Sequence, residues 1–459
     1  MIEPLHNATY RRLFLSHVLA LVATGLTTVA LALLAYDLAG GEAGAVLGTA
    51  LAIKMLTYVA IGPLAGAVAG WFPRRGLLVS LNLIRGGVVL LLPFVTEIWQ
   101  IYALVFTLQA ASAMFTPTLQ ATVPDIIPDE ATYTQALSLT RLAHDLENLL
   151  SPALAAMLLL FMSFHWLFGG TVIGLLIAAA IVYRTPLPTF SPGAVESGVG
   201  HRATLGLRIF AATPRLRGLL ALNMAVAAGG AMALVNTVIY VRDSLGLGDN
   251  HVAMAIAAFG AGSMLIALML PAALEYLRER SVMLGGAVLI GAALTLGLLG
   301  PDFLSLLLLW FLLGAGSSLV LTPSGRLLRR SAQPEDRPTL FAAQFSLSHA
   351  CWLFTYPLAG WLGLYWGLEP LFAGFAILSF AAAAAAWRLW PADDSLALEH
   401  VHADLPAGHH HIRDALPVND GFKHCHTYNV DRYHGYWPGP GRLVRAMRRR
   451  RAGQTGSRR

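Results

Sequence analysis

The chain has 459 residues, of which 56% are hydrophobic and only 12% are charged, and its mean hydropathy is +0.62. The charged fraction is about half of the ~25% found in soluble globular domains, which excludes an ordinary soluble enzyme and indicates a polytopic membrane protein. The net charge of +6 comes mainly from arginines in short connectors and in the C-terminal tail, and two cysteines exclude a disulfide framework.

Twelve hydrophobic runs follow one another along the chain, and each approaches the ~20 residues that a helix needs to cross a bilayer. They fall near 13–36, 45–69, 77–95, 99–122, 137–161, 166–183, 216–240, 251–273, 282–300, 303–323, 340–363 and 369–390. The first run has no cleavage pattern, so no removable signal peptide is expected.

The connector arginines gather on one side of these runs, and Arg242 alone lies in the connectors of the other side. By the positive-inside rule we expect a multi-pass protein of the cell inner membrane with both termini in the cytoplasm. The basic stretch "RAMRRRRAGQTGSRR" at the C-terminal end is then expected to lie near anionic lipid, and no nucleic-acid partner is expected.

The two halves of the apolar region resemble each other at an offset of roughly 205 residues. For example, "HDLENLLSPALAA" at 144–156 corresponds to "HACWLFTYPLAGW" at 349–361. Two parallel repeats are typical of a transporter that rocks about a central site. We therefore expect an all-α membrane fold of twelve transmembrane helices in two pseudo-symmetric six-helix bundles. The bundles would span 1–184 and 213–391, joined by a Pro/Gly/Ser-rich cytoplasmic linker at 185–212 and followed by a cytosolic tail at 392–459.

The connector between the second and third runs reads "GAVAGWFPRR" from Gly66 to Arg75. It resembles the cytoplasmic G-x-x-x-D-R-x-G-R-R motif of the major facilitator superfamily, with Gly66, Arg74 and Arg75 matching and Gly70 in place of the aspartate. The resemblance implies a gating loop at Gly66, Arg74 and Arg75, but the missing carboxylate removes one member of the usual charge relay.

The fifth run contains "ENLLSPALAA" at 147–156, which resembles the antiporter motif G-x-x-x-G-P-x-x-G-G of the same superfamily. Pro152 is kept, and Ser151 is a small residue at a glycine position. Small residues permit close helix approach in a membrane. The resemblance implies export rather than uptake.

Placing an ionisable group in a bilayer costs about 2.5–3.5 kcal/mol by insertion scales, so each such group indicates a structural or functional role. His144 lies eight residues before Pro152, and His349 lies eight before Pro357 in the second repeat, so we expect the two imidazoles to face one another across the midline. Arg141 and Asp145 form an i, i+4 pair, which could simply neutralise itself, and Lys54 is expected to pair with Glu147 or Asp145. The candidate substrate or metal residues in the membrane are His144, Glu147, His349, Asp145, His17, Asn148 and Cys351.

The tail is polar and rich in proline and glycine, which predicts a segment without a packed core. Its histidines come in H-x-H, H-H-H and H-C-H groups, a pattern that favours loose binding of borderline metal cations rather than a rigid zinc site. The candidate tail ligands are His400, His402, His409, His410, His411, His424, Cys425, His426 and His434. The alternative is a polar tail with incidental histidines.

A twelve-helix facilitator with "FTPTLQATVPDIIPDE" at 115–130 and a His-rich tail resembles nickel-resistance exporters of the NreB type. The resemblance implies secondary-active export of nickel, and possibly cobalt, by a monomer in the lipid bilayer, with protons as the coupling ion and no prosthetic group. No P-loop is present to use ATP. Two alternatives stay open: export of a drug or siderophore in the same fold, and a membrane metal sensor that does not transport.

Overall fold

The computed structural model describes residues 2–39, 43–68, 72–188, 199–394, 397–402, 409–419, 421–430, 434 and 437. Within these ranges, twelve helices of 18 or more residues follow the twelve predicted hydrophobic runs. They are α1 (Ala8–Ala39), α2 (Ala43–Val68), α3 (Arg74–Leu91), α4 (Ile98–Ile126), α5 (Glu130–Leu159), α6 (His165–Tyr183), α8 (Pro214–Ile239), α9 (Asp249–Tyr276), α10 (Glu279–Leu296), α11 (Phe303–Arg330), α12 (Arg337–Trp366) and α13 (Leu368–Leu389). Short helical turns are η1 (Glu3–His6), η3 (Leu92–Phe94), η4 (Tyr240–Ser244) and η5 (Gly297–Leu299).

Nine of the described helices are long and apolar enough to cross a membrane by length and composition. In α2 the apolar part spans the shorter Thr49–Ala65, and α5 carries several charged side chains. Charges within a helix that is otherwise part of the bundle are the feature that marks a functional position in a membrane protein.

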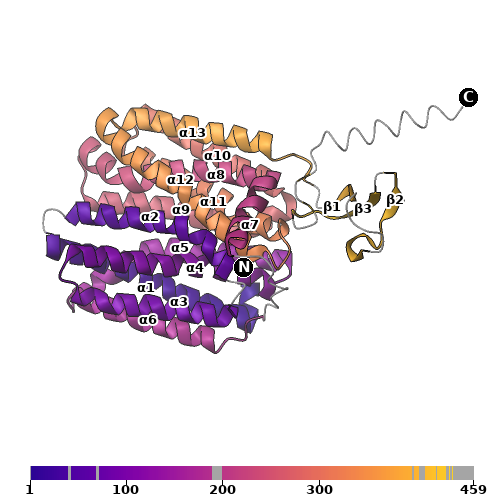
Figure 1. Cartoon of the computed structure of the whole chain (residues 1–459). Helices are drawn as coiled ribbons and strands as arrows, with labels where there is room; N and C mark the ends of the chain where they lie inside the picture. The colour runs from indigo at the N-terminus through magenta and orange to yellow at the C-terminus, as the bar shows by residue number, and fades with distance from the viewer. Residues whose placement is uncertain are drawn as a thin grey trace, which may run out of the picture.

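The helices pack as two bundles with the same neighbour relations (Figure 1). In the first bundle α1 packs on α6, α2 on α4, and α3 on both α4 and α6. In the second bundle α8 packs on α13, α9 on α11, and α10 on both α11 and α13. Each contact of the first bundle thus recurs in the second, as the repeat of the sequence predicts.

The two bundles meet along two main helix pairs, α2 with α12 and α5 with α9. These pairs are equivalent under the correspondence that relates the repeats, since α2 matches α9 and α5 matches α12. A two-fold arrangement of this kind lets one bundle rock against the other without breaking the packing inside either.

Residues 185–212, predicted as a linker, are helical in part. Val199–Ala212 form α7, which packs on α2 and α12. A Cβ added at Gly206 would lie 2.0 Å from the Thr339 carbonyl oxygen, so glycine is required for this close approach to α12. The connection between the bundles is therefore anchored to their interface.

The tail contains a small three-stranded antiparallel sheet, where the composition predicted no packed core. Its strands are β1 (Ala397–His402), β2 (Leu416–Val418) and β3 (Gly421–Thr427), in the order β1-β3-β2, and a 3₁₀ turn, η6 (His410–Ile412), precedes β2. The sheet extends from the end of the helical body that also holds the N-terminus (Figure 1). We call this end of the bundles the tail face. It carries the helix-end residues Arg74, Asp125, Glu130, Glu279, Arg330 and Arg337.

Candidate functional site

Four of the tail histidines lie on one face of a two-stranded ribbon. His400 and His402 are two residues apart on β1, and His424 and His426 are two apart on β3. Side chains alternate across a strand, so each H-x-H spacing places both rings on the same side. The antiparallel register pairs His400 with His424, which brings the two histidine pairs onto one shared face.

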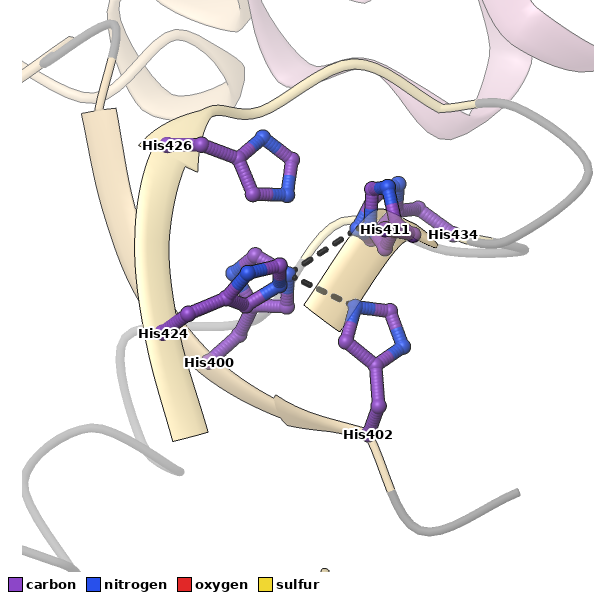
Figure 2. Close-up of side chains that lie close together, drawn as sticks. All are labelled: His400, His402, His411, His424, His426 and His434. Carbon is purple, nitrogen blue, oxygen red and sulfur yellow. Dashed lines mark hydrogen bonds between the residues drawn. The ribbon is translucent and has the colours of Figure 1, made fainter. Parts of the chain in front are cut away.

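His411 from η6 and His434 from the segment after β3 complete a group of six imidazoles, shown in Figure 2. We call these six residues the tail cluster. One ligand nitrogen from each ring lies within 4.8 Å of all the others. Three of the separations between Nε2 atoms are short: 3.1 Å for His400–His402, 3.3 Å for His411–His434 and 2.9 Å for His434–His400. Among the residues that the structure describes, no other group brings three or more potential metal ligands so close together.

Two rings of the tail cluster favour the neutral form. Burial, followed by the neighbouring His434 and His426, lowers the pKa of His411 from its usual value near 6.5 to about 4. Burial and the same two neighbours also lower the pKa of His424. A neutral imidazole keeps a nitrogen lone pair, which is the form that binds a metal ion.

The other predicted tail ligands lie apart from the cluster. His409 caps η6, where its Nδ1 accepts a hydrogen bond from the His411 backbone N–H at 3.2 Å. Cys425 is exposed between His424 and His426 on β3, and strand alternation turns it to the opposite face. The His410 side chain lies outside the described part of the structure.

In the membrane bundles, His17 of α1 and His144 of α5 meet with their ring centroids 5.3 Å apart. His144 Nδ1 lies 3.7 Å from Glu147 Oε2, as the i, i+3 spacing predicts. His17 also lines a small recess between α1, α4 and α5, together with Gln120 and Thr140. His17, His144 and Glu147 therefore lie together inside the first bundle.

Arg141 and Asp145 form the ion pair that their spacing predicts, at 3.1 Å. Arg141 Nε also donates a hydrogen bond to Ser263 Oγ on α9, at 2.8 Å. The pair therefore links the two bundles, and Asp145 is already neutralised where it lies.

His349 lies in a different environment from His144. Its Nδ1 is 2.7 Å from the Phe345 carbonyl oxygen, and its ring contacts Tyr58 of α2 at 4.8 Å between centroids. Among the ring contacts of the described residues, none joins His349 to His144. The ring contacts hold His144 in the α1–α5 interface and His349 in the α2–α12 interface, and the arrangement of the two imidazoles across the midline stays a prediction.

Two further predictions in the membrane region concern Lys54 and Cys351. Lys54 Nζ lies 5.7 Å from the Tyr58 ring centroid, and the ion pairs of the described residues do not join it to Glu147 or Asp145, contrary to the expectation. Cys351 is buried, and its Sγ donates to the Leu347 carbonyl oxygen at 3.4 Å. The Asn148 side chain lies outside the described part of the structure.

Arg74 of the predicted gating loop binds the carboxylate of Asp125, which was not predicted from the sequence. Arg74 binds Asp125 at the end of α4 at 2.5 Å, and Asp125 also binds Arg337 at the start of α12 at 2.7 Å. Arg337 belongs to the other bundle, so Asp125 ties the bundles together although Gly70 stands in place of the motif's aspartate. Arg75 lies over the Tyr183 ring, and Gly66 lies within α2.

The antiporter-like motif of α5 allows the close helix contact that small residues predict. A Cβ added at Gly25 of α1 would lie 2.1 Å from the Ser151 hydroxyl oxygen, so α1 and α5 approach nearly to backbone contact here. The Pro152 side chain lies outside the described part of the structure.

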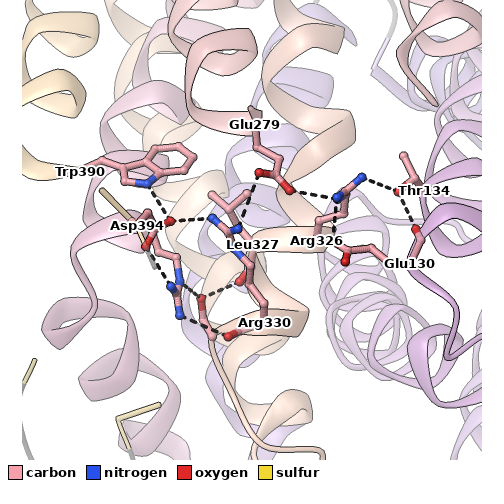
Figure 3. Close-up of polar contacts among 10 residues, drawn as sticks. Glu130, Thr134, Glu279, Arg326, Leu327, Arg330, Trp390 and Asp394 are labelled. Atoms are coloured by element: carbon pink, nitrogen blue, oxygen red, sulfur yellow. Dashed lines mark hydrogen bonds and ion pairs between the residues drawn. The ribbon is translucent and has the colours of Figure 1, made fainter. Parts of the chain in front are cut away.

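A second polar network crosses the tail face, shown in Figure 3. Arg326 of α11 binds Glu279 at 3.1 Å and reaches Glu130 of the first bundle at 2.7 Å. Arg330, one turn along α11, binds Glu279 at 3.6 Å and Asp394 at the root of the tail at 2.5 Å. The bundles are thus closed against each other on the side where the tail is attached.

The tail sheet is joined to this network by aromatic side chains. Tyr428 contacts the rings of His400 and His434 at 4.8 and 4.5 Å between centroids, and contacts Trp437 at 5.3 Å. Trp437 in turn lies 4.9 Å from the Arg215 guanidinium, which binds Asp394 at 3.0 Å. Tyr428 and Trp437 therefore connect the tail cluster to the ion pairs of the tail face.

Part of the chain is similar in sequence to known transport proteins. Over 135 residues the chain is 26% identical to YfiS of Bacillus subtilis (strain 168), described as an uncharacterized MFS-type transporter, which covers 29% of this chain and 32% of that protein. Over 152 residues it is 25% identical to macrolide efflux protein A of Enterococcus faecalis, which covers 31% of this chain and 47% of that protein. The chain thus spans about a third to a half of the length of these curated relatives.

Solved structures match over most of the chain. The human organic anion transporter MFSD10 superposes with a TM-score of 0.71 at 14% identity and covers 82% of this chain and 98% of its own. A bacterial homologue of the iron transporter ferroportin, in its outward-facing state, superposes with a TM-score of 0.66 at 13% identity and covers 83% and 98%. At these identities the likeness shows the fold alone. The family description "Major Facilitator Superfamily" matches residues 13–273 and 219–407, and the chain belongs to this superfamily of membrane transporters.

Proposed function

We propose that this transporter exports a divalent transition-metal cation, nickel or cobalt, from the cytoplasm by alternating access of its two bundles. The observation that carries the proposal is the tail cluster, in which six ligand nitrogens lie within 4.8 Å of one another. Imidazole suits nickel, zinc, copper and iron ions, whereas hard ions such as magnesium prefer oxygen ligands. A drug or organic anion would have no use for such a group.

The arginine-rich connectors support the assignment of the tail face to the cytoplasmic side. The tail cluster then lies on the side from which an exporter takes its cargo. In this proposal the metal enters the membrane through His17, His144 and Glu147, which the structure brings together beside a recess in the first bundle. Protonation of Glu147 and the imidazoles on the far side would release the ion, which gives proton antiport a physical basis.

The test is nickel flux into everted membrane vesicles, with and without an imposed pH gradient. The double variant His144→Ala/Glu147→Gln should abolish gradient-driven nickel uptake while the protein remains in the membrane. His165→Ala is the matched control, because His165 is exposed at the start of α6, and it should transport normally. Unchanged flux in the double variant would reject the membrane site.

The second candidate is export of an organic compound, favoured by the similarity to macrolide efflux protein A. It predicts gradient-driven macrolide uptake into the same vesicles, no nickel flux, and no effect of deleting residues 392–459. A membrane metal sensor that does not transport predicts no flux of either compound. The three outcomes exclude one another for a given cargo, so one set of vesicles separates the hypotheses.

A further inference from the structure

We infer that the tail cluster is one resident site for a single six-coordinate divalent ion, and that it favours nickel or cobalt over zinc. The inference deepens the proposed function and rests on it for the physiological role of the site. The coordination chemistry itself is argued from the tail residues alone. It replaces the expectation of a loose, multivalent histidine tail.

The spacing of the ligand atoms fits one octahedron. A metal–imidazole bond of about 2.1 Å places adjacent ligands of an octahedral ion about 3.0 Å apart and opposite ligands about 4.2 Å apart. Three Nε2 separations, those of His400–His402, His411–His434 and His434–His400, are 2.9–3.3 Å, and no pair among the six ligand nitrogens exceeds 4.8 Å. A small contraction of the cluster toward a central ion therefore satisfies all six rings at once.

Two other arrangements fit the geometry less well. A tetrahedral zinc ion would use four rings and leave the other two imidazoles crowded against it without a bond to the ion. Two ions would place two double charges within about 5 Å of each other among neutral ligands, with strong mutual repulsion. The nearby carboxylate of Glu399 lies on strand β1 one residue from His400, on the opposite face, and is paired with Lys423.

The identity of the ion follows from the ligand set. Zinc has a filled d shell and gains nothing from a six-coordinate field, so it prefers four ligands. Cobalt and nickel gain ligand-field energy from six nitrogen donors, and the affinity of a given site rises from manganese through iron and cobalt to nickel. Six imidazole nitrogens without a thiolate or carboxylate therefore favour nickel and cobalt over zinc.

The fold prepares the site before the ion arrives. Hydrogen-bonded pairing of β1 with β3 fixes four of the rings, and η6 supplies His411 from a separate segment. Tyr428 is buried against His400 and His434 and supports their orientation, as groups around a metal site commonly do. Ligands from four segments between residues 397 and 434 must converge, so binding of the ion also stabilises the folded tail.

Position separates this site from the transport route. The six rings belong to the tail sheet, whereas His17, His144 and Glu147 lie within the first bundle. Through Tyr428 and Trp437 the sheet contacts Arg215 on the tail face. The occupancy of this site therefore depends on the metal concentration in the compartment that the tail face contacts.

The test uses the full-length protein in detergent, stripped with a chelator and titrated with nickel, cobalt or zinc. The background carries His144→Ala/Glu147→Gln, so that binding in the bundles does not contribute. We expect one nickel ion per chain, six nitrogen neighbours by X-ray absorption, and the weak visible absorption of six-coordinate cobalt. Four-coordinate cobalt, with its intense blue absorption, or two ions per chain would overturn the inference, and so would tighter binding of zinc than of nickel.

Variants assign the binding to named rings. His411→Ala and His434→Ala should each weaken nickel binding at least tenfold and shift cobalt away from six-coordination. Cys425→Ser, on the same strand but the opposite face, should leave both unchanged. A tetrahedral site, combined with normal nickel flux in the parent protein without the His144→Ala/Glu147→Gln changes, would reject this inference and leave the proposed function standing. A six-coordinate site without any metal flux would do the reverse.

Discussion

Arg337→Gln is expected to open the tail face, because Arg337 of the second bundle binds Asp125 of the first bundle there. Its Nη1 lies 2.7 Å from Asp125 Oδ1, and the two side chains are 15% and 17% exposed. Such a pair lies between an exposed ion pair, worth about 0–1 kcal/mol, and a buried one, whose loss costs about 3–5 kcal/mol. Asp125 keeps Arg74 as a partner, so we expect a loss of about 1–2 kcal/mol from the closed state.

That loss corresponds to a shift of roughly 5- to 30-fold in the ratio of open to closed tail faces, at 1.4 kcal/mol per factor of ten. The shift is measured by double electron–electron resonance between spin labels at Ala131→Cys and Glu335→Cys, both exposed and on opposite bundles. Cys425→Ser removes the exposed native thiol, and Cys351 is buried. A longer label separation should gain population in Arg337→Gln.

Arg74→Gln is the matched control, because it removes the other partner of the same carboxylate. Arg74 is 3% exposed and joins α3 to α4 inside one bundle, so its loss should lower the melting temperature without changing the label separation. The reasoning fails if the two variants behave alike, or if Arg337→Gln leaves the distance distribution as it is in the parent.

Two further predictions concern packing and tail docking. Gly314→Ala should destabilise the second bundle by about 1–3 kcal/mol, because the new Cβ would lie 1.8 Å from the Phe259 carbonyl oxygen. The control Gly360→Ala should be tolerated, because a Cβ at Gly360 would have no neighbouring atom within 4 Å. Thermal unfolding of the two variants in detergent compares their stabilities. Trp437→Ala should release the tail from Arg215 and speed its removal by limited proteolysis at least several-fold, and equal cleavage rates in variant and parent would show that this contact does not hold the tail.

The helical body could be predicted from the sequence because its cause is local. A run of about 20 apolar residues has only one way to bury its backbone polar groups in lipid, and that is a helix. The repeat between 144–156 and 349–361 likewise predicted equivalent helices, α5 and α12, and the structure pairs each with the matching partner helix, α9 and α2. The linker departs from this pattern because α7 is stabilised by α2 and α12, which a local reading of proline and glycine content does not include.

The charged groups of the membrane region could be predicted only by spacing along one helix. His144 with Glu147 and Arg141 with Asp145 follow from i, i+3 and i, i+4 geometry. Which helix lies opposite them is set by tertiary packing, so His144 meets His17 while His349 meets Tyr58. Asp125 was missed for the same reason, since its two arginine partners come from α3 and α12.

In the tail, the two-residue spacing of the histidines was a sequence signal for β-strands. His400 and His402, like His424 and His426, are two residues apart, which is the repeat of a strand face as well as a feature of loose histidine runs. Composition by itself predicted a metal-binding tail and a membrane-spanning body, because both depend on residue type and local spacing. Whether the imidazoles would act as separate ligands or as one site depended on the pairing register of β1 with β3 and on His411 and His434 folding over it. Contacts between residues far apart in the chain are decided by the packing of the whole domain, and no local pattern encodes them.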